Sequence, residues 1–152
     1  MIIPGEKKPL AKKELLKIPV FGWIATSACV IVDRSSGESR KKSMAKLKKI
    51  LADGISILLF AEGTQNRSKD LLQPFKDGAF RIAIDMQQPI LPLVVVGAGP
   101  LMPPGTIDLK PGRIKVIAGP EITTTGLTVT DQAALKQQTF SIMEKMILKA
   151  KQ

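Results

Sequence analysis

Two short apolar runs flank an amphipathic segment, and this order restricts the chain to a few folds. Residues 29–32 (CVIV) and 55–60 (ISILLF) have the length and composition of buried strands. Between them, the segment 39–53 repeats apolar side chains every three or four residues among lysines, and Gly54 stands where a helix C-cap is expected. Because such a helix suits a crossover between parallel strands, the pattern predicts a strand, a helix and a parallel strand, with the two strand ends side by side.

The rest of the chain continues the alternation of helices and strands. The sequence predicts two brief helices within 12–23 separated by Pro19, and a longer helix from Phe75 to Met86. A strand over 90–96 and a loop over 97–105 are expected next, followed by a hairpin of two short strands (107–109 and 114–118) with Gly112 in its turn. A closing helix is predicted from 130 or 131 to 149. Together these elements predict an α/β sandwich, with a mainly parallel central sheet flanked by helices, in a single domain over residues 1–152.

Charge and aromatic content limit the classes of partner. The chain carries 23 Lys and Arg against 13 Asp and Glu, a formal charge of +10, which favours phosphates, acidic lipids, nucleic acid or an acidic carrier protein. Aromatic residues make up only 4% of the chain and tyrosine is absent. Proteins that bind single-stranded nucleic acid usually stack its bases on aromatic side chains, so this composition argues against that class. Nucleic acid is therefore ranked last, and no nucleic-acid partner is predicted.

Two residue types exclude whole kinds of chemistry. Cys29 is the single cysteine, so no disulfide can form within the chain, and its apolar surroundings predict a small core residue rather than a nucleophile. The chain has no histidine, which removes a Ser-His-Asp triad, a histidine general base and a histidine-ligated zinc site from these 152 residues. No metal site is predicted.

Membrane contact, if the chain makes any, is expected to be peripheral. The fully apolar stretches are far shorter than the roughly 18 to 20 residues that a transmembrane helix needs. Trp23 has two interpretations: its ring packs in the core, which is the favoured one, or it lies at a membrane interface.

Polar residues follow both strands of the strand, helix and strand unit. The first run leads into Asp33 and Arg34, and the second leads into 62–68 (EGTQNRS). Ligands of open parallel sheets collect outside the carboxyl ends of the strands. The two loops are therefore predicted to converge as a binding site for an anionic group.

Four blocks of the sequence, in order, resemble the glycerolipid acyltransferase family of the 1-acylglycerol-3-phosphate O-acyltransferase (lysophosphatidic acid acyltransferase) type. They are AKKELLKIPVFGW at 11–23, CVIVDRSS at 29–36, FAEGTQNRS at 60–68 with PFKDGAF at 74–80, and PILPLVVVGAG at 89–99. The third is similar to the family's most diagnostic block, a Phe-Pro-Glu-Gly-Thr-Arg-Ser sequence followed by a Lys-Gly pair. The resemblance covers roughly residues 10 to 120.

The resemblance implies a site, a reaction and its partners. The implied substrate- and phosphate-binding residues are Lys12, Arg34, Glu62, Gly63, Thr64 and Arg67. The implied reaction moves an acyl chain from acyl-carrier protein or acyl-CoA, as co-substrate and without a cofactor, to a lysophospholipid hydroxyl in phospholipid biosynthesis. The implied location is the cytoplasmic face of a membrane, reached peripherally. Lys12 and Lys76 are weaker candidates because lysine-rich faces are usually solvated. Three residues have an alternative role: Arg34 as a partner of Asp33 or a solvated side chain, Glu62 as a cap of a loop or helix start, and Gly78 as a packing glycine.

The sequence also departs from the family's pattern. Ala61 stands in place of a proline, and Gln65 in place of an arginine, which leaves the headgroup preference open. The family's Asn-His-x4-Asp motif, whose histidine is the general base, does not occur in these residues. We therefore expect a chain truncated at its N-terminus, without the family's N-terminal helices and without a catalytic residue of its own. The alternative function is an inactive remnant that binds phospholipid or an acidic partner.

Overall fold

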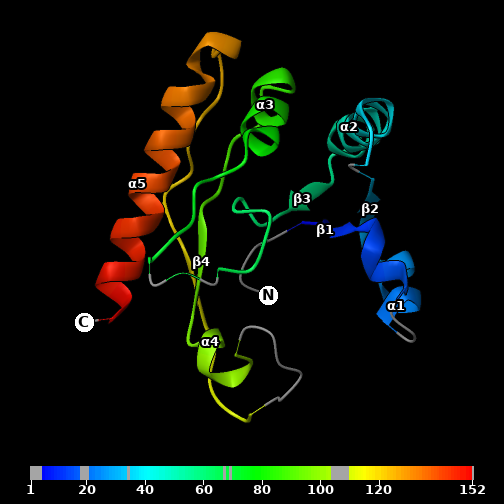
Figure 1. The fold of residues 1–152 in the computed structure, drawn as a ribbon. Helices are drawn as coiled ribbons and strands as arrows, with labels where there is room; N and C mark the ends of the chain where they lie inside the picture. The colour runs from blue at the N-terminus through cyan, green and yellow to red at the C-terminus, as the bar shows by residue number, and fades with distance from the viewer. Residues whose placement is uncertain are drawn as a thin grey trace. The chain divides into compact units, whose positions relative to one another are not determined.

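A parallel three-stranded sheet organises the first part of the chain, and its strand order differs from the prediction. The computed structural model describes residues 5–17, 21–33, 35–66, 68, 70–103 and 110–151. The sheet has the order β2-β1-β3, formed by Val30–Val32, Lys7–Lys12 and Ser56–Leu58 (Figure 1). Leu10–Lys12 pair with β2, and Lys7–Pro9 pair with β3.

The central strand β1 was missed by the sequence analysis. Its sequence, KKPLAK, contains three lysines and a proline, and a proline argues against a central strand because it lacks an N–H donor. The predicted parallel relation of β2 and β3 is confirmed, since both pair parallel to β1. The prediction that their ends lie side by side was wrong, because β1 lies between them.

Three helical segments accompany this sheet. The 3₁₀ helix η1 (Lys13–Lys17) and the helix α1 (Phe21–Ala28) confirm two brief helices, although α1 runs further than predicted. The helix α2 (Gly37–Ala52) begins at Ser36, whose side chain accepts a hydrogen bond from the Ser39 amide. Gly54 follows its end with φ +78°, as a helix-terminating glycine should. Since α1 packs on β1 and β2, and α2 on β2 and β3, the predicted α/β class is confirmed.

The second part of the chain has its own core. The chain divides into two compact units, residues 1–59 and 60–152. In the second unit α3 (Asp77–Asp85) and α5 (Gln132–Lys151) lie side by side (Figure 1). The core beneath them is formed by Leu72, Phe75, Phe80, Ile84, Ile122 and Leu135. The expectation of a single domain stays a prediction.

The remaining elements of the second unit are short. The strand β4 (Leu93–Val96) pairs antiparallel with β5 (Lys115–Ala118), an arrangement that the sequence analysis did not predict. The predicted strand over 107–109 lies outside the described residues. The predicted loop after β4 contains the helix α4 (Ala98–Leu101), and α5 is preceded by the 3₁₀ helix η2 (Val129–Asp131).

None of the described helices combines the length and the apolarity that crossing a bilayer requires.

Candidate functional site

The segment 60–76 forms a loop that starts with a tight turn. The Gly63 amide donates to the Phe60 carbonyl oxygen over 3.0 Å, and Gly63 adopts φ +72°. This left-handed conformation is readily open to glycine and strained for residues with a Cβ atom. The structure therefore gives Gly63 a backbone role in addition to the ligand approach that the sequence suggested.

Glu62 closes this loop across its base. Its Oε2 atom accepts a hydrogen bond from the Gln73 amide over 2.7 Å, and the Lys76 amide donates to the Ala61 carbonyl oxygen over 2.8 Å. A hydrogen bond to a charged acceptor is stronger than one between neutral groups. The carboxylate of Glu62 therefore holds the two ends of the loop together.

Apolar packing anchors the same loop from its C-terminal side. Leu72 and Phe75 are buried in the core of the second unit, at 9% and 6% exposure. The centroid of the Phe75 ring lies 6.1 Å from that of the Phe80 ring, with the two rings stacked, and 5.1 Å from that of the Phe140 ring, with the two rings tilted. The base of the loop is thus part of the core, and the polar residues project from a fixed frame.

The far part of the loop is organised by its own polar side chains. The Asn66 Oδ1 atom accepts from the Ser68 amide and hydroxyl, both over 2.9 Å, and the Asn66 Nδ2 atom donates to the Asp70 backbone carbonyl oxygen over 3.0 Å. Thr64 is exposed, and its hydroxyl lies 3.3 Å from the Gln73 side-chain oxygen. Arg67, a predicted phosphate-binding residue, lies outside the described residues.

In the first unit, Asp33 ends β2 and gathers several donors. Its Oδ1 atom accepts from the Ser35 hydroxyl over 2.6 Å and the Ser35 amide over 2.9 Å. Its Oδ2 atom accepts from Lys13 Nζ over 2.9 Å. The Ser35 hydroxyl, then the Ser35 amide, and then Lys13 hold the pKa of the Asp33 carboxyl well below its usual range. Arg34 lies outside the described residues.

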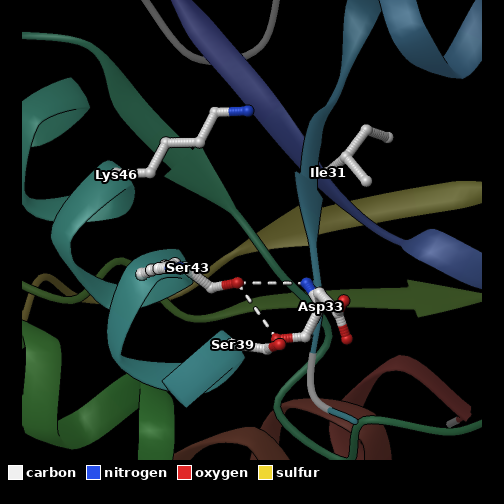
Figure 2. Close-up of a pocket in the computed structure, with 6 residues that line it drawn as sticks. Ile31, Asp33, Ser39, Ser43 and Lys46 are labelled. Carbon is white, nitrogen blue, oxygen red and sulfur yellow. Dashed lines mark hydrogen bonds between the residues drawn. The ribbon is translucent and has the colours of Figure 1, made fainter. Parts of the chain in front are cut away.

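The backbone of Asp33 is held by α2. The Asp33 amide donates to the Ser43 hydroxyl oxygen, and that hydroxyl donates to the Asp33 carbonyl oxygen, each over 3.0 Å (Figure 2). An open pocket lies beside this pair, lined by Ile31, Asp33, Ser39, Lys42, Ser43 and Lys46. None of these six residues is among the six predicted substrate- and phosphate-binding residues, although Asp33 directly precedes Arg34 in the sequence.

Lys12 ends β1 at the edge of the sheet where β2 also ends. It stands opposite Val32 in the parallel register, and its side chain is exposed. Lys13, the next residue, is occupied by its ion pair with Asp33, whereas Lys12 makes no ion pair with the residues that the structure describes. Among the lysines at this end of β1, Lys12 is therefore the one whose charge a ligand can use.

The described residues of the predicted site are divided between the two units. Lys12 and Asp33 belong to the first unit, and Glu62, Gly63 and Thr64 belong to the second. The joint site of the six predicted residues therefore stays a prediction. The sequence analysis missed the anchoring residues Lys13, Ser43 and Gln73, because their roles depend on partners 10 to 20 positions away.

Comparison with known proteins adds independent information. A model of the Acyltransferase family matches residues 4–96. An uncharacterised acyltransferase of Schizosaccharomyces pombe is 34% identical over 142 residues, which are 91% of this chain and 51% of the yeast protein. The 1-acyl-sn-glycerol-3-phosphate acyltransferase alpha of Homo sapiens is 31% identical over 138 residues, which are 88% of this chain and 48% of the human protein.

A solved structure has the same fold. The crystal structure of the 1-acyl-sn-glycerophosphate acyltransferase of Thermotoga maritima superimposes with a TM-score of 0.75 at 22% identity, covering 95% of this chain and 57% of that one. The chain thus spans about half the length of the yeast and human relatives. The family match covers both unit 1 and the Glu62 loop, and it confirms the resemblance on which the site was predicted: the chain belongs to the Acyltransferase family.

Proposed function

We propose that this chain holds the acyl acceptor of a lysophospholipid acyltransferase, at a membrane surface. The supporting observation is the family match over residues 4–96, which includes a Glu-Gly-Thr loop clamped to the core. In the proposed reaction the acceptor hydroxyl oxygen attacks the thioester carbonyl of acyl-carrier protein or acyl-CoA. A new C–O ester bond forms and the C–S bond breaks, while a base takes the hydroxyl proton and passes it to the departing thiolate, which leaves as a thiol.

The acceptor phosphate is assigned to cationic side chains. Arg67, Arg34 and Lys12 are the proposed donors, because arginine pairs with phosphate through two parallel hydrogen bonds and Lys12 has an available charge. Glu62 is proposed to position the loop, since its carboxylate bonds the Gln73 amide. The net charge of +10 favours both the phosphate and an acidic donor.

Phosphate binding is tested by comparing two ligands that differ only in that group. We expect Arg67→Ala to weaken binding of a short-chain lysophosphatidic acid about tenfold or more and to leave binding of the matching monoacylglycerol nearly unchanged. Arg113→Ala is the matched control, because Arg113 is an exposed arginine outside the proposed site. Titration calorimetry gives both affinities. Equal losses for the two ligands would contradict the assigned role.

A second assay tests whether the chain binds the lysophospholipid without catalysing acyl transfer. A positioned general base accelerates such reactions by about 10²- to 10⁴-fold, and the family's base is a histidine, a residue that these 152 positions lack. We therefore expect the chain alone to bind the lysophospholipid and to show no enzyme-like acyl transfer from acyl-CoA. Turnover by the purified chain would show that another group serves as base.

A further inference from the structure

The helix α1 presents an apolar outer face. Trp23 is 83% exposed and Ile24 is 52% exposed, and the sequence of the helix, FGWIATSA, contains no charged residue. A helix at a protein–water boundary normally carries charged or polar side chains on its outer face. The favoured sequence interpretation, in which Trp23 packs in the core, was therefore wrong.

The hydroxyl groups on α1 do not make this face polar. The Thr26 hydroxyl donates to the Gly22 carbonyl oxygen over 2.8 Å, and the Ser27 hydroxyl donates to the Ile24 carbonyl oxygen over 2.9 Å. Such back-bonding satisfies the hydroxyl donor within the helix itself. The face can consequently leave water without leaving a donor unpaired.

Positive charge accompanies the apolar face. The segment η1, which packs against α1, carries Lys13 and Lys17, and both are exposed. Lys13 is paired with Asp33, so Lys17 is the η1 lysine that can meet a lipid phosphate. The close fit is visible at Gly22, where an added Cβ atom would lie 2.5 Å from the Leu16 carbonyl oxygen. Residues 1–59 contain twelve Lys and Arg against five Asp and Glu, so this unit holds seven of the ten net charges. Apolar and cationic groups thus lie on adjoining segments of one unit.

We propose that α1 docks on an anionic lipid surface, with Trp23 and Ile24 entering the interface and Lys17 of η1 contacting lipid phosphates. Eight residues of helix span about 12 Å, too short to cross a bilayer, so α1 lies in the plane of the interface. Tryptophan is enriched at this depth, and lysines near an anionic surface add attraction. The inference rests on the proposed function in one respect, namely that a lysophospholipid acceptor resides in such a surface.

The single tryptophan makes the proposal directly measurable, because all Trp emission comes from α1. With vesicles of phosphatidylglycerol and phosphatidylcholine, we expect Trp23 emission to move to shorter wavelength and to be quenched by lipids brominated on the acyl chain. Pure phosphatidylcholine should give a much weaker response. No change with anionic vesicles would overturn the proposal. A shift that grows with protein concentration in the absence of lipid would also overturn it, since a second copy would then cover the face.

A matched pair of variants distinguishes docking through α1 from a general effect of one added negative charge. Ile24→Glu keeps the Trp23 reporter and should weaken vesicle binding about tenfold or more. Leu148→Glu makes the same change at a helical residue of the second unit with similar exposure, 50% against 52%, and should bind as the wild type does. Equal weakening by both variants would contradict docking through α1. Far-UV circular dichroism checks that both variants fold.

The proposed function can fail independently of this docking. The vesicles contain neither lysophosphatidic acid nor a thioester, so Trp23 insertion does not depend on the phosphate site. Conversely, selective binding of soluble lysophosphatidic acid can hold for a chain that does not bind vesicles.

Discussion

At the residue scale, Asp33 joins three segments that are distant in sequence. Its side chain receives hydrogen bonds from Ser35 and Lys13, and its backbone is paired with Ser43. The residue is followed by Arg34, one of the proposed phosphate donors. The bonds of Asp33 therefore fix the end of β2, directly before Arg34 in the sequence.

The low pKa of Asp33 makes its contribution depend on pH. Because the folded-state pKa is depressed, the carboxylate contributes stability above its ordinary pKa of 3.8, and this contribution is lost as the pH falls below that value. We expect Asp33→Asn to unfold at lower urea concentration than the wild type at pH 7, with the difference narrowing toward about pH 3. Trp23 fluorescence follows the first unit. Glu121→Gln, at an exposed carboxylate, is the control and should show little difference at either pH.

Two glycines of the proposed site region should respond oppositely to the same substitution. Gly63→Ala is expected to destabilise the chain by about 1–2 kcal/mol, because alanine is strained at φ +72°. Gly78→Ala is expected to stabilise it by about 0.5 kcal/mol, since Gly78 is helical and an added Cβ atom meets nothing within 4 Å. Thermal unfolding followed by circular dichroism measures both. The open space at Gly78 also contradicts its interpretation as a packing glycine, and stabilisation by Gly63→Ala would contradict the turn assignment.

At the scale of elements, α3 connects the core to the Glu62 loop. Phe80 is 1% exposed on α3, and its stacking partner Phe75 ends the loop. The aromatic contact therefore couples the stability of this helix to the position of Glu62.

Removing that contact should be costly. We expect Phe80→Ala to lower the free energy of unfolding by about 3–5 kcal/mol, through lost burial and the cavity that remains. Far-UV circular dichroism is the suitable probe, because Trp23 lies in the other unit. Val129→Ala, at a residue that is 60% exposed, should change stability by less than about 0.5 kcal/mol. A small effect of Phe80→Ala would show that the core repacks around the gap.

At the scale of the whole molecule, the uneven charge has a measurable consequence. Unit 1 carries seven of the ten net positive charges, and it also contains α1 and Lys12. Attraction between exposed charges is screened by salt over about 10 Å at 0.1 M. We expect binding to anionic vesicles to weaken several-fold between about 0.05 and 0.5 M salt. Vesicle sedimentation measures it, and salt-independent binding would assign the interaction to apolar contact alone.

Local patterns in the sequence were sufficient for much of the architecture. The apolar periodicity of α2, α3 and α5, the glycine after α2 and the short β-branched run of β2 all predicted elements that the structure contains. The family could also be predicted from the sequence, because its motifs are short linear blocks, and the match over residues 4–96 confirms it. These features depend on residues within a few positions of one another, so the sequence alone determined them.

Other features were decided only by tertiary structure, because they depend on partners distant in sequence. The pattern of lysines and Pro9 in β1 hides its pairing with β2 and β3, and only that pairing makes it the central strand. The Glu62 carboxylate acquires its loop-closing role from the Gln73 amide, and Trp23 is exposed because α1 turns it away from the packed side of the unit. Periodicity marks a residue as apolar or polar, whereas the packing of segments decides whether that residue faces the core, a neighbouring strand or the surroundings.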